Sequence, residues 1–531
     1  MVAVVLGVVL LLLPSGFFAW RYRTMPQLGA YHDDAVYWIS AQALAHGDGY
    51  VVNHLPEKPA QTKYPPLYPA VLATIWVVAG NFPANLKVLA ALQWSFVPIV
   101  LLLGWLFFRR CGFSAMACYL MTAVIAAGPM TVIFGTAPMT ELPFTALLLT
   151  VFLILEGERE LTPKRAFFAG LFAAATFLTR TNGIVLAASV PVLLLWRRKF
   201  GATLSFLAPL CAAIAGWQVW CSVHKFPATD LILSYYTSYL GFYIQNFSWA
   251  EFPNRMWVNA DAIIEGLPRL ILFSTGADSM GLRIAAWVMT AAAVAGAVAL
   301  FRSGLRHYVL FAGLFIGMLV VWEYPPDPRF LYPLLPLYLA GLFTKLSEVG
   351  KLGLVTWRKG GLDNRTAAAF VLSIIVSLGV GCAVSLANGL IRVLPAFYEE
   401  REKERDQLQP TYRWIASNTP QNARFAAYDD TMLFLYTGRH GYTVPILPPL
   451  VYANDSEGVA KFIGGLDSLW REKNVTYVLV TRDDFQRDFH EPAQAALRRL
   501  VADRSRFEPV YTDAAAEVYR LLQPPANTGS D

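Results

Sequence analysis

The stretch YHDDAVYW at residues 31–38 places two adjacent carboxylates, Asp33 and Asp34, directly after an apolar N-terminal segment. Two carboxylates that approach each other at low dielectric constant repel, and the pKa of one of them rises, which suits a general base. The apolar positions that follow also fit a short amphipathic helix on the membrane surface, with one aspartate as its N-cap. Capping explains one carboxylate and leaves the second for chemistry.

A second group of candidate residues is cationic and suited to binding phosphate. Lys63 lies in TKYPPLYP, next to Tyr64 and before an apolar stretch. Arg329 lies in EYPPDPRFLYPLLP, and an arginine can bind two phosphate oxygens at once. More ordinary roles are also open: Lys63 would reach a lipid headgroup at the membrane surface, and Arg329 would pair with Asp327 or Glu323.

Three further features are weak when taken singly. Glu141 in PMTEL begins an apolar segment, and Arg180 in TRTNG lies between two such segments. The stretch 234–253 is rich in Tyr, Phe and Trp, which is typical of an aromatic belt at a membrane interface. Its alternative function would be to stack aromatic rings on the faces of sugars.

The composition indicates that most of the chain is embedded in lipid. It has 531 residues, of which 56% are hydrophobic and only 15% are charged, against about 25% charged in soluble domains. The net charge is +6 and the longest basic run is Arg197–Lys199, so nucleic-acid binding is not indicated.

We expect about eleven membrane-spanning helices, because each needs roughly 20 apolar residues. The stretch 64–80 is apolar but begins with prolines, which favours a helix lying at the interface. The expected spans are 1–20, 86–108, 113–134, 139–156, 165–180, 182–196, 201–222, 282–301, 307–322, 330–346 and 366–388.

Basic residues predict which ends of these helices face the cytoplasm. Alternate short loops carry clusters of Lys and Arg, beginning with Arg109–Arg110 and ending with Lys345–Arg365, and such loops stay inside. The long loops 21–85 and 223–281 then lie outside. This sidedness brings five ionisable residues to the extracytoplasmic ends of different segments, namely Asp33, Asp34, Glu141, Arg180 and Arg329. Such groups usually pair or line a cavity.

The chain divides by composition into a membrane part at 1–395 and an extracytoplasmic α/β domain at 396–531. A charged helical stalk leads into the domain, whose last eight residues, PPANTGSD, are expected to be disordered. The expected strands are 423–428, 474–481 and 515–522, and the expected helices are 455–473 and 485–504.

The order of these features resembles the GT-C membrane glycosyltransferases, in particular their protein O-mannosyltransferase and aminoarabinose-transferase-like branch. The resemblance covers the whole chain and combines motifs that are loose singly. They are the outer acidic pair, the lysine–proline motif before an interfacial helix, TELP, TRTNG, PDPRFLYPLLP, and an outer C-terminal domain with YRWIASNTP and LYTGR. The chain departs from the family in reading TKYPP where members often read EKPP.

The resemblance implies an inverting transfer of a sugar from a polyprenyl-phosphate carrier to an acceptor hydroxyl on the extracytoplasmic side. Asp33, or its neighbour Asp34, would be the catalytic base. The carrier phosphate would be met by Lys63, Arg329 and Arg180, with Glu141 and Tyr64 in supporting roles. The acceptor would be a lipid, a glycan or a protein, and the enzyme would be integral to a plasma membrane or bacterial inner membrane.

No cofactor motif accompanies these residues, and a divalent metal between Asp33 and Asp34 is conceivable but not favoured by the resemblance. Two other classes of function stay open. A transporter or flippase of an anionic lipid or solute would need charges at mid-membrane, whereas these gather at one face. A membrane scaffold without catalysis would leave the convergence of the outer charges without a purpose.

Overall fold

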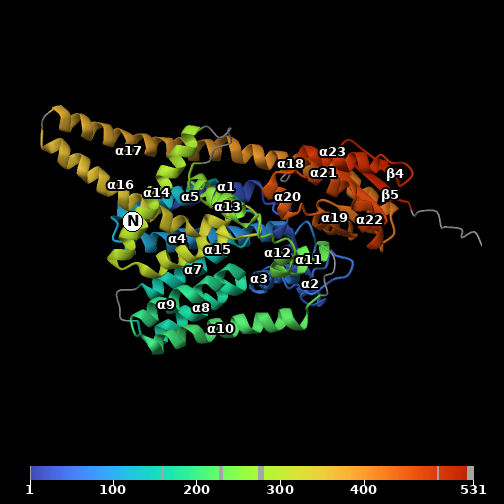
Figure 1. Ribbon diagram of the computed structural model, residues 1–531, viewed down its shortest axis with the longest axis horizontal. Coiled ribbons are helices and arrows are strands. Elements are labelled where there is room, and N and C mark those ends of the chain that lie inside the picture. Colours follow the sequence, from blue (N-terminus) through green and yellow to red (C-terminus); the bar gives the residue numbers. More distant parts are fainter. Residues whose placement is uncertain are drawn as a thin grey trace, which may run out of the picture.

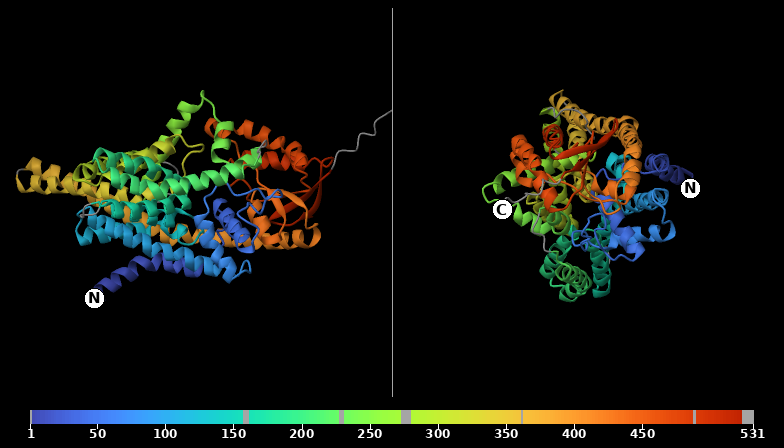
Figure 2. Two further views of the ribbon diagram at one scale, coloured as in Figure 1. Left: turned by 90° about the horizontal axis from the view of Figure 1, so that it is seen from below. Right: turned by 90° about the vertical axis from the view of Figure 1, so that its right-hand side faces the viewer.

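The computed structural model describes residues 2–156, 161–226, 231–272, 280–360, 362–486 and 489–522. The molecule is elongated, with a bundle of helices along most of its length and the C-terminal sheet at one end (Figure 1; Figure 2). The helices α16 (Leu335–Arg358) and α17 (Leu362–Asn388) project from the bundle at the end opposite that sheet (Figure 1). The predicted tail, 524–531, falls outside the described residues.

Apolar segments form the bundle. Among the described residues, five helices are long and apolar enough to cross a membrane, and six further apolar helices are shorter. The number of spans therefore stays a prediction. The bundle helices are α1 (Val2–Arg21), α4 (Leu86–Arg110), α5 (Ala115–Ala127), α7 (Glu141–Leu155), α8 (Pro163–Thr179), α9 (Leu186–Trp196), α10 (Phe200–Val223), α14 (Met280–Ser303), α15 (Arg306–Val320), α16 (Leu335–Arg358) and α17 (Leu362–Asn388).

Three expected spans differ from continuous α-helices. The segment 113–134 breaks at Gly128, before α6 (Pro129–Phe134), because Pro129 has no N–H to donate to the preceding turn. The segments 182–196 and 330–346 begin as short 3₁₀-helices, η1 (Thr181–Val185) and η2 (Pro328–Leu334). These 3₁₀ turns place Arg180 and Arg329 at the ends of their helices.

The loop 21–85, which the sequence predicts to be the first outer loop, folds into two short helices, α2 (Asp33–His46) and α3 (Leu67–Val78). With 12 residues α3 is only about 18 Å long, too short to span a bilayer core of about 30 Å. It packs on α2, where Trp76 Nε1 donates to the Trp38 carbonyl at 3.1 Å. The second outer loop forms α11 (Leu231–Thr237), α12 (Tyr239–Gln245) and α13 (Phe252–Arg269).

The C-terminal part carries a sheet of five strands in the order β2-β1-β3-β5-β4 within the described residues. Strand β1 runs parallel to β2 and to β3, whereas β5 is antiparallel to β3 and β4. The strands are β1 (Arg424–Ala427), β2 (His440–Tyr442), β3 (Tyr477–Thr481), β4 (Phe507–Thr512) and β5 (Ala516–Leu521), and the helices are α19 (Asp430–Thr437), α20 (Pro448–Ala453), α21 (Ser456–Gly464), α22 (Leu466–Glu472) and α23 (His490–Val501).

The three strands expected from the sequence are present as β1, β3 and β5, and β2 and β4 were not predicted. Strand β2 has three residues, and β4 contains Pro509, which is tolerated because β4 is an edge strand. The helix α17 continues through a π-helical turn, η3 (Gly389–Val393), into α18 (Leu394–Asn418). The predicted boundary at 395 therefore lies inside a continuous helix and stays a prediction.

One hydrophobic core joins the sheet to the first outer loop. Trp38 and Tyr68 of that loop belong to the same buried cluster as Trp470 and Val478 of the C-terminal part. The carboxyl ends of the parallel strands β1 and β2 continue into Tyr428 and Thr443, which line a cavity between the sheet and the bundle. This packing fixes the C-terminal part as one wall of that cavity.

Candidate active site

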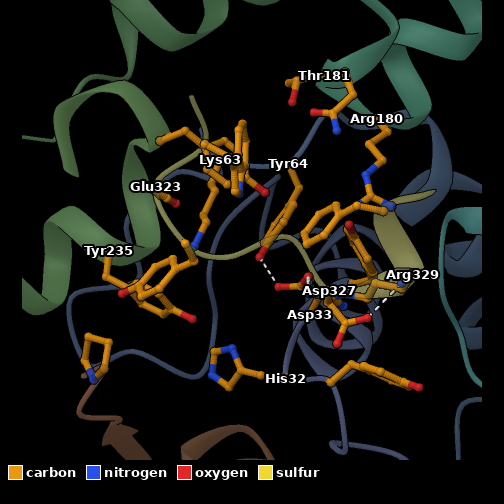
Figure 3. A pocket seen from close by; sticks show the side chains of 18 of the residues that line it. His32, Asp33, Lys63, Tyr64, Arg180, Thr181, Tyr235, Glu323, Asp327 and Arg329 are labelled. Carbon is orange, nitrogen blue, oxygen red and sulfur yellow. Dashed lines mark hydrogen bonds and ion pairs between the residues drawn. The ribbon is translucent and has the colours of Figure 1, made fainter. Parts of the chain in front are cut away.

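A cavity of about 510 Å³ lies where one end of the helix bundle meets the C-terminal part. Its lining comes from segments that are far apart in the sequence: 31–37, 63–65, 179–182, 235–239, 322–330, 428 and 443–451. Figure 3 shows the ionisable side chains Asp33, Lys63, Arg180, Glu323 and Arg329 around this space. Of the five ionisable residues expected to converge, Asp33, Arg180 and Arg329 line this cavity, whereas Asp34 and Glu141 do not.

Asp33 lies in the cavity wall and both of its carboxylate oxygens have partners. Oδ1 accepts a hydrogen bond from the Tyr64 hydroxyl at 2.5 Å, and Oδ2 accepts one from Arg329 Nη2 at 2.9 Å (Figure 3). Burial by itself would raise the pKa of Asp33, but Arg329, Lys63 and the Tyr64 hydrogen bond outweigh burial and hold the pKa at about 2. The expected rise in pKa from a neighbouring carboxylate is therefore wrong for Asp33.

Asp34 points away from Asp33 and outside the cavity lining. It is fully buried, and its Oδ2 accepts a hydrogen bond from the Gly29 backbone N–H at 2.9 Å. The residue before the helix is His32, and neither aspartate caps α2 through its side chain. The two acids therefore have separate surroundings, and only Asp33 faces the space where a substrate would lie.

The two cavity arginines stack against one aromatic ring. The guanidinium carbons of Arg180 and Arg329 lie 4.7 and 4.9 Å from the centre of the Phe330 ring. Among the described residues, Nη1 of Arg329 is buried and has no hydrogen-bond partner, so part of the hydrogen-bonding capacity of this guanidinium is unused. Asp327 accepts the backbone N–H of Arg329 at 2.8 Å and so caps η2, while the Arg329 side chain pairs with Asp33.

Glu141 forms an ion pair with Arg180 from outside the cavity lining. Its Oε1 is 2.7 Å from Arg180 Nη1, the glutamate is fully buried, and it lies outside the cavity lining. A buried carboxylate is stable as an ion only when it is paired, and Arg180 supplies that pair. The position of Glu141 therefore supports Arg180 and gives the glutamate no contact with a ligand.

Lys63 lies among aromatic rings. Its Nζ is 3.9 Å from the ring centre of Tyr235, 5.0 Å from that of Tyr239 and 5.6 Å from that of Tyr64. The side chain is only 6% exposed, and this burial lowers the pKa of Lys63, an effect that Asp33 and Glu323 partly counter. Such a cage keeps the ammonium group at the cavity wall, in place of the extended position at the membrane surface that was the alternative.

Glu323 is a second acid in the cavity. It is 7% exposed, and its Oε2 is buried without a hydrogen-bond partner in the part of the chain that the structure describes. Burial raises the pKa of Glu323 to about 7, with Lys63 and Arg255 acting in the opposite direction. The sequence offered this residue only as a partner for Arg329, and the side chain lies instead on the Lys63 side of the cavity (Figure 3).

Residues of the aromatic stretch 234–253 lie in two different environments. Tyr235 and Tyr239 line the cavity, whereas Ile244 and Trp249 are more than half exposed, as an interfacial belt requires. Sequence reasoning singled out the stretch but not these two tyrosines, and it missed Phe330 and His32. Tyr235 lies in α11 and Tyr239 begins α12, so no single helical period in the sequence marks the two tyrosines as neighbours.

Among the described residues, no group of three or more His, Cys, Asp and Glu side chains is arranged to hold a metal ion. In particular, Asp34 does not join Asp33 at the cavity. The cations that face the cavity are Lys63, Arg180 and Arg329. They give the site a positive end next to the acid Asp33.

Comparisons with solved structures identify the fold. ArnT from Cupriavidus metallidurans in the apo state aligns with a TM-score of 0.50 and 15% sequence identity, over 92% of this chain and 93% of that one. The same protein bound to undecaprenyl phosphate gives a TM-score of 0.50 at 14% identity, with the same coverage. The apo Archaeoglobus fulgidus oligosaccharyltransferase gives 0.51 at 12% identity, over 89% of this chain and 69% of that one.

These likenesses show that the chain has the fold of ArnT and of the oligosaccharyltransferase, which is the GT-C fold that the sequence resembles. No family model matches the chain. No curated protein matches it either. At such identities the fold is shared, and the activity has to be argued from the site.

Proposed function

We propose that this protein is an inverting glycosyltransferase that moves a sugar from a polyprenyl-phosphate carrier to an acceptor hydroxyl at the extracytoplasmic face of the membrane. The observation that supports it most is the cavity in which Lys63, Arg180 and Arg329 lie beside Asp33. A transporter would need such charges along a path through the bilayer, whereas these gather at the end of the bundle next to the sheet. The fold shared with ArnT bound to undecaprenyl phosphate is consistent with this donor class.

The donor phosphate would bind at the cationic end of the cavity. Arg329 has an unused Nη1 and a planar group that matches two phosphate oxygens, and Lys63 adds a point charge. When the bond from the sugar to the phosphate breaks, negative charge grows on the leaving phosphate. Cations that are already in place stabilise that charge without having to reorganise, which accounts for most of the catalysis in such a site.

Donor binding would also prepare Asp33 as the base. Arg329 and Lys63 hold the pKa of Asp33 down against the effect of burial. A phosphate that takes over these two cations removes their effect on the carboxylate, and burial then raises the pKa of Asp33 toward the range of a general base. Proton transfer is thereby coupled to the presence of the donor.

The chemical step is a single displacement. The acceptor oxygen forms a bond to the anomeric carbon as the bond to the phosphate oxygen breaks, so the configuration inverts. The acceptor proton moves to Asp33, and the polyprenyl phosphate leaves bound to Arg329 and Lys63. Protonated Asp33 returns its proton to water or to the leaving phosphate when the product is released.

The test uses purified protein in detergent with a panel of polyprenyl-phosphate sugars and a membrane extract as the source of acceptors. We expect one donor to yield free polyprenyl phosphate, followed by mass spectrometry, and Asp33→Asn to abolish its release. The proposal is wrong if no donor turns over in the presence of the extract.

Transfer should not depend on a divalent metal. Asp33 pairs with Arg329 whereas Asp34 accepts the Gly29 N–H, and arginine and lysine side chains would neutralise the phosphate. We expect an excess of EDTA to leave the transfer rate unchanged. Loss of activity with EDTA, restored by added Mg²⁺ or Mn²⁺, would replace this account with a metal-assisted one.

Glu323 should make phosphate binding depend on pH. Its pKa of about 7 means that the carboxyl is neutral below pH 7 and charged above it, where it competes with the phosphate for Lys63. We expect the affinity for the methyl ester of polyprenyl phosphate, whose charge is constant near neutrality, to fall roughly three- to tenfold from pH 6 to pH 8.

Glu323→Gln should keep the higher affinity at both pH values, because glutamine stays neutral. The matched control is Glu265→Gln, which alters a carboxylate that pairs with Arg269 outside the cavity. An equal fall in affinity for the wild type and Glu323→Gln would assign the titration to another group.

A further inference from the structure

The residue directly before Asp33 has a strained backbone. His32 has φ 59° and ψ −50°, and the Asp33 N–H donates to the Tyr31 carbonyl at 2.6 Å across it. These values describe a γ-turn of the positive-φ type, which is rare and costly for any residue with a Cβ. Such a turn persists only where surrounding contacts hold it, and strained residues of this kind gather at functional sites.

The contacts that hold His32 come from distant parts of the chain. Its Nε2 lies 3.1 Å from the Tyr236 hydroxyl and 3.3 Å from Asp430 Oδ1. Asp430, the first residue of α19, is fully buried. Its Oδ2 accepts hydrogen bonds from the Tyr236 hydroxyl at 2.6 Å and from the Thr443 N–H at 3.0 Å.

The position of the Asp430 carboxylate is therefore set by contacts other than the one with His32. The bond to the Thr443 N–H ties the carboxylate to the end of strand β2, and His54 Nε2 approaches the same oxygen at 3.5 Å. The remaining oxygen, Oδ1, faces the imidazole of His32. The C-terminal part thus contacts the first outer loop at His32, the residue directly before Asp33.

We propose that Asp430 is a positioning residue: by holding His32 in the strained turn, it directs Asp33 into the cavity toward Arg329 and Tyr64. The catalytic consequence rests on the proposed function, because it assumes that Asp33 acts on the acceptor. The arrangement gives the C-terminal part a role in the chemistry, since a carboxylate anchored in its sheet sets the backbone from which Asp33 projects. Asp34 accepts a hydrogen bond from the Gly29 N–H, which also holds the first turn of α2 in place.

A matched pair of variants distinguishes the effect of the strained backbone turn from the effect of losing the imidazole. His32→Gly and His32→Ala both remove the imidazole, but glycine adopts a positive φ freely whereas alanine does not. We expect His32→Gly to keep most of the wild-type kcat, and His32→Ala to lose about tenfold or more, the factor that strain of this kind converts to. The KM for the donor should be unchanged in both. Equal losses in the two variants would overturn the proposal and assign a direct role to the imidazole.

Asp430→Asn supplies the second test, in which its effect on kcat is measured in the wild type and in the His32→Gly protein. It should lower kcat in the wild type by a factor similar to that of His32→Ala, and have little further effect in the His32→Gly protein, where no strained turn needs holding. Equal effects in both backgrounds would contradict the proposal.

Melting temperatures in detergent without substrate make the same comparison independently of transfer. We expect His32→Ala to melt below His32→Gly, and Asp430→Asn to destabilise the wild type more than the His32→Gly protein. If no donor is turned over by the wild type, the proposed function fails, and these melting temperatures still decide whether Asp430 holds the turn. Identical melting temperatures for His32→Gly and His32→Ala would overturn it.

Discussion

Asp33→Asn will abolish sugar transfer in a protein that still folds and still binds the donor. In the wild type the Tyr64 hydroxyl donates to Asp33 Oδ1 at 2.5 Å, and the asparagine oxygen of the variant can accept the same hydrogen bond. The local packing should therefore persist. It removes the charge and the basicity that proton transfer requires. Loss of a general base lowers kcat by about 10²- to 10⁴-fold. The KM for the donor should not rise, because the variant removes the carboxylate that competes with the phosphate for Arg329.

Asp34→Asn is the matched control, because it makes the same chemical change one residue away. An asparagine oxygen can still accept the Gly29 N–H that Asp34 now accepts at 2.9 Å. We expect Asp34→Asn to retain kcat to within about tenfold, the cost of a single weakened buried hydrogen bond. Rates of release measured side by side decide between the acids. An inactive Asp34→Asn beside an active Asp33→Asn would reverse their assignment.

The sequence predicted which residues converge but not how they are paired. Sidedness from Lys and Arg was enough to bring Asp33, Arg180 and Arg329 to one end of the bundle, because a helix of known direction fixes where its ends lie. The ion pair between Arg329 and Asp33 joins residues 296 positions apart. No local pattern specifies such a pair, since it depends on how η2 and α2 pack in three dimensions.

The residues that were missed have in common that their roles depend on rotamer and backbone. Phe330 looked like one apolar residue in FLYPLLP, and only the packed structure brings two guanidinium groups to its ring. His32 carries no sequence signal for a positive φ, because glycine is the residue that usually marks one. Strand β2 is too short for a two-residue period to be recognised, yet it positions Thr443 against Asp430.

Arg329→Ala should have the second large effect, and it should appear in two measurements. The guanidinium is the group that pairs with Asp33 and would bind the phosphate of the donor. Its loss should weaken binding of polyprenyl phosphate and lower kcat/KM by about 10²- to 10³-fold, as when a preorganised donor to a developing charge is removed. Arg329→Lys should restore only part of this, because an ammonium group is neither planar nor bidentate.

The pH profile provides the sharper readout. Arg329 lowers the pKa of Asp33, whereas burial raises it, so removal of the guanidinium must move that pKa upward from about 2. The acidic limb of the kcat/KM profile should therefore shift to higher pH in Arg329→Ala, while it stays in place in Arg283→Ala, which removes an exposed arginine paired with Asp261. A lower rate with an unshifted limb would mean that Arg329 binds phosphate without controlling the charge of Asp33, and the coupling of donor binding to base activation would then be wrong.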